Sequence, residues 1–314
     1  MLQFLRKYKL TYQVFNFFKK NQLKHNLPLY KKYGLAKKYF SAISSEDFKG
    51  IESPLNKYDR KDSRTEMPKD ILFQSLEEKT QKSLLNWSED GYVILENFFT
   101  EKEVEAFNQE VESLLDSGEV KFRYRNKIMF AMHKSSLLKQ AGSNDKILKI
   151  LEVLMGKKVD LFQSINFLTG SQQRTHSDSI HMTTFPYGNL IAIWVALEDI
   201  QPDSGALHYY PRSHKLPYVM NREYDNIGSR HKLGDKTYSD YENKIEEVIQ
   251  KNQFKKETFL PKKGDVLIWH ANLLHGGNKL SNKGSTRKSM VFHYYAQDAI
   301  CFHEISQRPT LKRD

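Results

Sequence analysis

Apolar and polar positions follow two different periods along the chain, and the change from one to the other falls near Val159. Before this point apolar residues recur at helical spacing, and Thr100 with Glu103 forms a capping box. Gly156 is a helix stop signal, and Gly91 predicts a turn before a short strand at 92–95. The pattern predicts helices at 71–87, 100–115 and 146–155.

After Val159, short apolar runs predict strands at 161–168, 190–197, 206–210, 266–269 and 288–295. A polar stretch after His214 interrupts them and ends in helical spacing at 241–249. Helices followed by a strand-rich core are typical of a mainly β double-sheet jelly roll with N-terminal helices. We expect a basic extension and linker at 1–70 and a domain at 71–314, with its core at about 159–298 and an insertion at about 215–255.

The composition is that of a folded chain, with 39% hydrophobic and 12% aromatic residues and few Gly or Pro. This excludes collagen, a coiled-coil rod and a fully disordered chain. No run of about 18 apolar residues predicts a membrane-spanning helix. The single cysteine, Cys301, cannot form an internal disulfide, and the basic N-terminal segment lacks a secretory cleavage site. We therefore expect a reducing, cytoplasmic location.

The formal net charge of +11 comes almost entirely from residues 1–45, which carry ten basic residues and no acid before Glu46. The rest of the chain is close to neutral, so we do not expect a nucleic-acid-binding protein. Aromatic and aliphatic residues alternate with these lysines. Residues 1–45 therefore form either a packed helical extension, which we favour, or an amphipathic segment that contacts an anionic membrane or a partner.

Candidate chemistry begins with His176 and Asp178, which follow a predicted strand. Two residues that are two positions apart on an extended segment point to the same side, so both can bind one metal ion. His275 follows the strand at 266–269, and Arg287 lies twelve residues further on. Two histidines and one carboxylate form the facial triad that leaves three positions on Fe(II) open for a 2-oxoacid and dioxygen. The planar fork of an arginine suits the far carboxylate of 2-oxoglutarate.

Five separate motifs in the second half of the chain resemble the phytanoyl-CoA dioxygenase family of Fe(II)/2-oxoglutarate oxygenases. They are THSD, IAIWVALEDI, DSGALHYYPRSHK, KKGDVLIWHANLLHGG and Arg287. The resemblance implies a double-stranded β-helix and an Fe(II)/2-oxoglutarate-dependent oxygenase, and it does not identify the substrate. We expect the enzyme to hydroxylate a C–H bond of a small-molecule or lipid-like substrate. The resemblance also implies iron ligands at His176, Asp178 and His275, and a 2-oxoglutarate site at Arg287, Gln173, Trp194 and Ser213.

Several positions carry alternatives. His270 lies near enough to His275 to be the second histidine ligand, although we favour His275. His181 is either a substrate-pocket residue or an exposed loop residue. Gly277 stands where family members often have a hydroxyl, and Lys127 is a candidate to replace that donor. Asp178 is the ligand that halogenating relatives lack, so its presence indicates oxygen transfer.

Two rival functions are a catalytically silent metal-binding jelly roll and a cupin-type metalloenzyme that does not use 2-oxoglutarate. The complete triad argues against the first of these. Arg287 argues against the second, because an enzyme without 2-oxoglutarate does not need a carboxylate-binding fork at this place.

Overall fold

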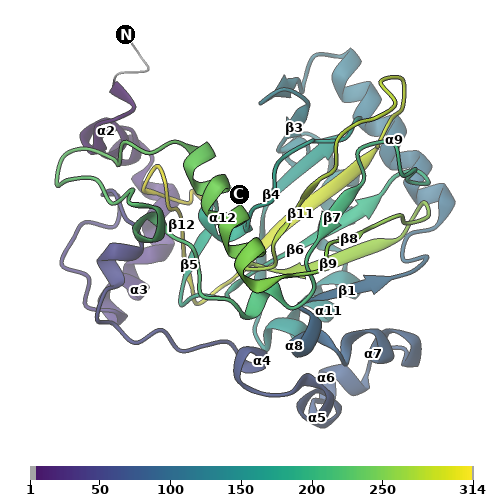
Figure 1. The fold of residues 1–314 in the computed structure, drawn as a ribbon, viewed down its shortest axis with the longest axis horizontal. Coiled ribbons are helices and arrows are strands. Elements are labelled where there is room, and N and C mark those ends of the chain that lie inside the picture. The colour runs from purple at the N-terminus through teal and green to yellow at the C-terminus, as the bar shows by residue number, and fades with distance from the viewer. Residues whose placement is uncertain (1–4, 313–314) are drawn as a thin grey trace.

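The computed structural model describes residues 5–312, and its centre is a seven-stranded antiparallel sheet (Figure 1). Across the sheet the strands lie in the order β1 (Tyr92–Leu95), β9 (Val266–His270), β6 (Leu190–Ala196), β11 (Ser289–Ala296), β4 (Val159–Phe167), β3 (Lys127–Met129) and β2 (Phe122–Arg123). Two small sheets accompany it: β10 (His275–Gly277), β7 (Leu207–Tyr209) and β8 (Glu257–Thr258), and then β13 (Arg308–Pro309), β12 (Ile300–His303) and β5 (Thr183–Phe185). The fold is a double-stranded β-helix with flanking helices, as the sequence predicted.

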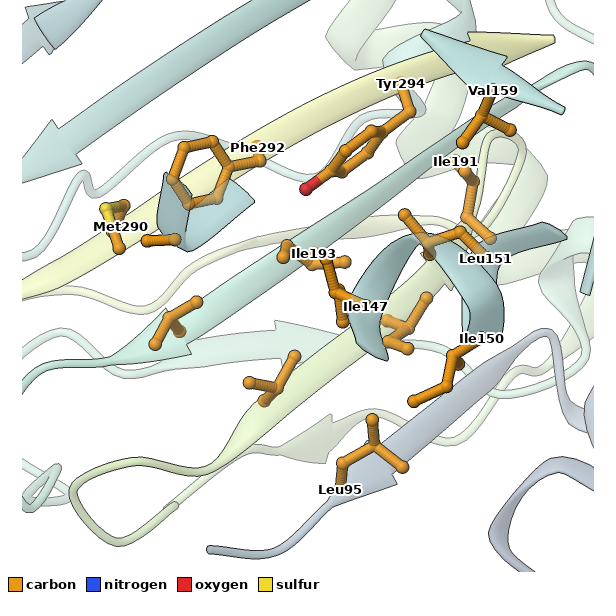
Figure 2. Close-up of a cluster of buried hydrophobic side chains, with 14 of the residues drawn as sticks. Leu95, Ile147, Ile150, Leu151, Val159, Ile191, Ile193, Met290, Phe292 and Tyr294 are labelled. Carbon is orange, nitrogen blue, oxygen red and sulfur yellow. The ribbon is translucent and has the colours of Figure 1, made fainter. Parts of the chain in front are cut away.

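The two faces of the large sheet have different roles because successive side chains of a strand point to opposite sides. On β11, Met290, Phe292 and Tyr294 belong to the large apolar core under the helices, whereas Val291 and His293 point into the interior of the β-helix. Figure 2 shows the helix-covered face, where Ile147, Ile150 and Leu151 of one helix pack against the sheet. The opposite face of the sheet, toward the interior of the β-helix, is therefore the one that can carry a functional site.

Two of the three helices predicted in the first half are confirmed. They are α9 (Glu101–Asp116), which begins with the capping box of Thr100 and Glu103, and α11 (Asp145–Met155). Gly156 ends α11 with a φ of 63°, a left-handed conformation that glycine adopts without a steric penalty. A further helix, α10 (Ser136–Ser143), was not predicted.

The prediction of one helix at 71–87 is wrong. This segment forms α6 (Ile71–Gln74), α7 (Glu78–Leu84) and α8 (Trp87–Asp90). The Ser75 hydroxyl donates to the Leu72 carbonyl at 2.6 Å, and the Gln81 amide donates to the Leu76 carbonyl at 2.8 Å. Such side-chain bonds to backbone compete with the regular helical ladder, which is how a short apolar repeat is broken into single turns.

The first part of the N-terminal segment, with α2 (Lys9–Phe18), α3 (Leu27–Lys32) and 3₁₀ turns at 20–26 and 45–48, lies near the small sheet that contains β12 and β5. Its second part, with α4 (Lys57–Arg60), α5 (Ser63–Glu66) and a 3₁₀ turn at 67–69, packs on the large core beside α8. Tyr30, Ile43 and Phe48 of the first part are buried, and the ring of Phe48 stacks on that of Phe185 at 4.0 Å. Residues 46–72 are thus a wrap around the body. The division of the chain at about residue 70 stays a prediction.

The polar stretch at 215–255 contains one long helix, α12 (Tyr238–Asn252), which crosses in front of the strands in Figure 1. Tyr241, Ile245 and Ile249 bury one side of α12 against Ile180 and Leu274. The insertion is thereby fixed next to the segments that carry the candidate metal ligands. None of the helices in the described part of the chain is long and apolar enough to cross a membrane.

Candidate metal and cosubstrate site

His176, Asp178 and His275 meet in the interior of the β-helix. One potential ligand atom from each lies within 4.8 Å of the others, and all three residues are buried. Asp178 Oδ1 is 3.8 Å from His176 Nε2 and 3.7 Å from His275 Nε2. The backbones of the two histidines exchange a pair of hydrogen bonds of 2.9 Å, so a bridge between two strands fixes their separation.

Both histidine rings present the same nitrogen to this centre. The Nδ1 of His176 donates to the carbonyl of Arg174 at 2.9 Å, and the Nδ1 of His275 donates to the carbonyl of Leu273 at 2.9 Å. A neutral imidazole that donates through Nδ1 has its free lone pair on Nε2. This bond sets the tautomer and the orientation of a metal-binding histidine.

The charges at the site suit a divalent cation. Burial alone raises the pKa of the Asp178 carboxyl, but the imidazoles of His275, His293 and His176 hold that pKa below its usual range. Burial, and then the neighbouring His275, lower the pKa of His176 well below its ordinary value. The site therefore offers the neutral imidazole of His176 and an ionised carboxylate, and imidazole with carboxylate is a donor set that Fe(II) accepts.

His270, the alternative histidine, lies outside this cluster. Its Nε2 is 3.3 Å from Asp59 Oδ1, and its Nδ1 accepts a hydrogen bond of 3.1 Å from the Asn272 backbone. The structure brings His275, and not His270, next to His176 and Asp178.

Arg287 is a buried cation, 2% exposed, and comes two residues before the start of β11 in the sequence. Its guanidinium carbon lies 5.2 Å from the ring centre of Phe167 and 5.5 Å from that of Trp194. Burial lowers its pKa to about 10, and within the described chain its Nε has no hydrogen-bond partner. A buried guanidinium with an unsatisfied donor between two aromatic rings fits the carboxylate of a cosubstrate.

Gln173 and Lys127 lie beside the candidate metal ligands. Lys127 Nζ donates to Gln173 Oε1 at 2.8 Å, and Gln173 Nε2 is 3.2 Å from His176 Nε2. Burial lowers the pKa of Lys127, although Asp178 opposes this shift. Both side chains are therefore close enough to reach a molecule that binds next to the metal.

Ser213 and Gly277 have backbone roles that the sequence did not reveal. The Ser213 hydroxyl donates to the Tyr210 carbonyl at 2.7 Å and accepts from the Leu274 backbone at 2.8 Å, so it supports the loop that leads to His275. Its contact with a cosubstrate stays a prediction. A Cβ at Gly277 would lie 2.5 Å from Ser171 Oγ and 2.9 Å from the backbone nitrogen of Gln172, so a hydroxyl-bearing side chain does not fit there unless this backbone shifts.

Sequence analysis missed several residues at the site. Tyr241, from the first turn of α12, accepts a hydrogen bond of 3.0 Å from the backbone N–H of Ser177, which stands between two ligands. The ring of Tyr238 lies 4.8 Å from that of half-buried His181. No motif marks these tyrosines, because an insertion brings them in from a distant part of the chain.

A double-stranded β-helix with this triad and a buried arginine defines a non-haem Fe(II)/2-oxoglutarate-dependent dioxygenase, which uses Fe(II), 2-oxoglutarate and dioxygen. The chain belongs to the phytanoyl-CoA dioxygenase family, whose sequence pattern it matches over residues 87–289.

Comparison with individual proteins agrees with this assignment. An ectoine dioxygenase of Nocardia farcinica is 26% identical over 250 residues, which cover 71% of this chain and 82% of that protein. A phytanoyl-CoA dioxygenase domain-containing protein 1 homolog of Caenorhabditis briggsae is 23% identical over 195 residues, or 58% of this chain and 68% of that protein.

Solved structures share the fold at lower identity. The non-haem α-ketoglutarate-dependent carbocyclase SnoK of nogalamycin biosynthesis aligns with a TM-score of 0.59 at 18% identity, over 77% of this chain and 95% of that one. Iron-bound EctD of S. alaskensis aligns with a TM-score of 0.52 at 18% identity, over 70% and 77% of the two chains.

Proposed function

We propose that His176, Asp178 and His275 bind the Fe(II) of this dioxygenase, that Arg287 binds its 2-oxoglutarate, and that it hydroxylates a C–H bond of a small-molecule or lipid-like substrate. The observation that carries the cosubstrate assignment is the buried Arg287 with its unpartnered Nε. Bound Fe(II) and 2-oxoglutarate would supply the activation of dioxygen: 2-oxoglutarate would lose carbon dioxide and become succinate, which would take one oxygen atom, while the other would enter the C–H bond of the substrate.

The residues of this chain would bind the metal and the cosubstrate, orient them and shield them from water. Arg287 would pair with the far carboxylate of the cosubstrate, while Trp194 and Phe167 pack against its guanidinium and keep water away from the pair. Gln173 and Lys127 would donate to oxygen atoms that lie nearer the metal ligands. Ionised Asp178 and neutral His176 need no proton transfer before they bind a cation.

Two rival functions make different predictions about turnover. A silent metal-binding jelly roll would bind Fe(II) and release no succinate, and a cupin-type enzyme would be indifferent to 2-oxoglutarate. The buried Arg287 supports the dioxygenase over both rivals, because a buried N–H donor without a partner, as at its Nε, is costly unless a ligand accepts from it.

The side of the site next to α12 is where we expect the substrate to bind. His181 has its ring 6.0 Å from that of His176 and 5.4 Å from that of His303. Burial lowers the pKa of His181 to about 3 and that of His303 to about 4. With Tyr238 beside them, these neutral rings offer hydrogen bonds and aromatic faces to a small molecule.

Substrate-dependent succinate release tests this function. The purified protein with Fe(II), 2-oxoglutarate and dioxygen is given a panel of small molecules, and ectoine is included because a relative is an ectoine dioxygenase. A true substrate raises succinate release above the unstimulated level and gains one oxygen atom by mass. If no succinate forms with or without any compound while Fe(II) still binds, the silent-protein hypothesis replaces this one.

We further propose that α2 contacts an anionic membrane surface. Leu10, Val14, Phe17 and Phe18 stand at helical spacing and are all exposed, with Leu10 67% and Phe18 78% accessible. The helix buries Asn16 instead, whose amide donates to the Phe40 carbonyl at 3.1 Å. An apolar stripe that points to solvent is unusual for a helix docked on its own domain.

The charges around this stripe support an anionic lipid surface as its partner. Arg6, Lys7, Lys19, Lys20 and Lys24 are exposed, and no acidic residue precedes Glu46. Basic residues beside an apolar helix face are the combination that binds at the interface of anionic bilayers. The packing of Tyr30 and Ile43 on the body holds the helix in place for such contact.

We also propose a cytoplasmic location for the protein. Cys301 is a free, buried cysteine, which is consistent with a reducing compartment.

A further inference from the structure

The two oxygens of the Asp178 carboxylate have different surroundings. Oδ1 faces His176 and His275 at 3.8 and 3.7 Å. Oδ2 accepts a hydrogen bond of 2.9 Å from the indole Nε1 of Trp269, and His293 Nε2 lies 3.5 Å from the same oxygen. One oxygen is thus directed to the metal centre, and the other is occupied by donors from two strands of the large sheet.

We propose that Trp269, together with His293, is a positioning residue that holds Asp178 as a one-oxygen ligand. This inference rests on the proposed ligand set. An indole N–H can only donate, so Trp269 fixes which oxygen turns away from the metal. A carboxylate that bound through both oxygens would take one of the three positions that the cosubstrate and dioxygen need.

Both partners of Oδ2 lie on the same face of the large sheet. Ala192 of β6 pairs with Trp269 of β9 on one side and with His293 of β11 on the other, so the three residues form one row across adjacent strands (Figure 1). All three are buried, with exposures of 1%, 2% and 3%. Ala192 has the smallest side chain of this row and stands between Trp269 and His293, whose Nε1 and Nε2 atoms lie 2.9 Å and 3.5 Å from Asp178 Oδ2.

Trp269 also touches a second ligand. Its ring centre lies 5.0 Å from that of His275 and 6.4 Å from that of His293. A single buried side chain therefore contacts one ligand through a hydrogen bond and another through its ring face. Loss of the indole N–H alone should release the carboxylate while leaving the packing against His275 largely in place.

The first test compares Trp269→Phe with the wild-type protein in its metal-free form. Partners that orient a metal ligand are worth about 10- to 100-fold in metal affinity, so Trp269→Phe should bind Co(II) weaker by that factor. The visible absorption of bound Co(II) should also change, since it responds to the number of coordinating atoms. Trp87→Phe is the matched control, because Trp87 is equally buried and lies in the core under the helices.

A second pair of variants keeps the inference testable if Trp269→Phe does not fold. His293→Gln retains an N–H donor and His293→Leu removes it, so only the leucine variant should lose Co(II) affinity. Ala192→Val should act like Trp269→Phe, because two added methyl groups would crowd the place between Trp269 and His293.

The outcomes separate this inference from the proposed function. If Asp178→Ala and His176→Ala bind Co(II) as the wild type does, the ligand set itself is wrong. If those variants lose the metal while Trp269→Phe keeps both the affinity and the spectrum, the positioning role is wrong. If His293→Gln and His293→Leu bind Co(II) with equal affinity, His293 has no part in positioning Asp178.

Discussion

Asp59, in the N-terminal wrap, lies with its Oδ1 3.3 Å from Nε2 of His270, on the strand that leads to His275. Burial raises the pKa of this carboxyl, but His270, by its charge and a hydrogen bond, more than offsets that effect and the pKa lies below its usual value. The contact links a segment before the family region to β9. It indicates a structural role for His270, whereas His275 lies with the other two candidate metal ligands.

His270→Ala should therefore keep metal affinity and lose stability. Removal of one partner from a buried polar pair costs about 1–3 kcal/mol. Urea unfolding of the metal-free protein measures the loss, and a Co(II) titration checks that affinity stays within about threefold of the wild type. A His270→Ala protein that folds normally but no longer binds Co(II) would show that the wrong histidine was chosen.

The Asp59 contact also predicts a pH dependence. A carboxyl whose folded pKa is lowered stabilises the fold fully above its unfolded pKa of about 3.9, and this contribution is lost as the pH falls through the folded value. The difference in unfolding free energy between wild type and Asp59→Asn should therefore shrink as the pH falls below about 4. If this difference in unfolding free energy grows on acidification, the pKa of Asp59 is not lowered in the folded protein.

The triad variants His176→Ala, Asp178→Ala and His275→Ala should each abolish 2-oxoglutarate consumption. Enzymes with this site consume some cosubstrate without a substrate, so succinate release at fixed Fe(II) can be measured before the substrate is known. His270→Ala is the matched control and should retain most of the activity. Full activity in any triad variant would remove that residue from the ligand set.

Arg287→Lys should raise the apparent 2-oxoglutarate constant about tenfold to a hundredfold. Lysine keeps the charge and loses the planar fork, so one charged hydrogen bond of about 1.5–3 kcal/mol is lost. Lys288→Arg is the control, since Lys288 is the next residue and pairs with Glu112 at the surface. An unchanged constant in Arg287→Lys would place the cosubstrate carboxylate elsewhere, with Lys127 the next residue to test.

The residues that were predictable from the sequence are those held by short-range rules. The long strands, the capping box at Thr100 and the stop at Gly156 follow from local period and backbone preference. The resemblance supplied His176 and His275 because ligands of this kind sit in local motifs. Each of these signals lies within a few residues of the feature that it predicts.

The residues that escaped prediction depend on long-range packing. β5, β10 and β12 have only three or four residues each, too few to show a period. Trp269 reaches Asp178 across 91 positions, and Tyr241 reaches Ser177 across 64. Only the register of the strands and the path of the insertion bring such pairs together. His293 had the clearest signal, because it lies on a predicted strand, where it alternates with Phe292 and Tyr294 and so faces the side opposite to theirs.

The last prediction concerns the exposed stripe of α2. Leu10→Glu with Phe18→Glu should abolish sedimentation with vesicles of mixed neutral and anionic phospholipid, because the change removes apolar contact and adds charge repelled by the lipid. Both side chains are largely exposed, so the melting temperature should hardly move. Wild-type protein should pellet at low salt and dissociate as salt rises, since each cation near the surface contributes about 1 kcal/mol that screening removes.

Leu23→Ala is the matched control, because Leu23 lies in the same segment and is fully buried. Its truncation should cost about 2–5 kcal/mol of stability and leave vesicle binding intact at a temperature where the variant is folded. If the wild-type protein never pellets, or pellets equally with Leu10→Glu and Phe18→Glu in place, α2 does not bind the bilayer. Its exposed stripe would then belong to a contact with another protein or a second copy of this chain, which sedimentation velocity would detect as a change in mass.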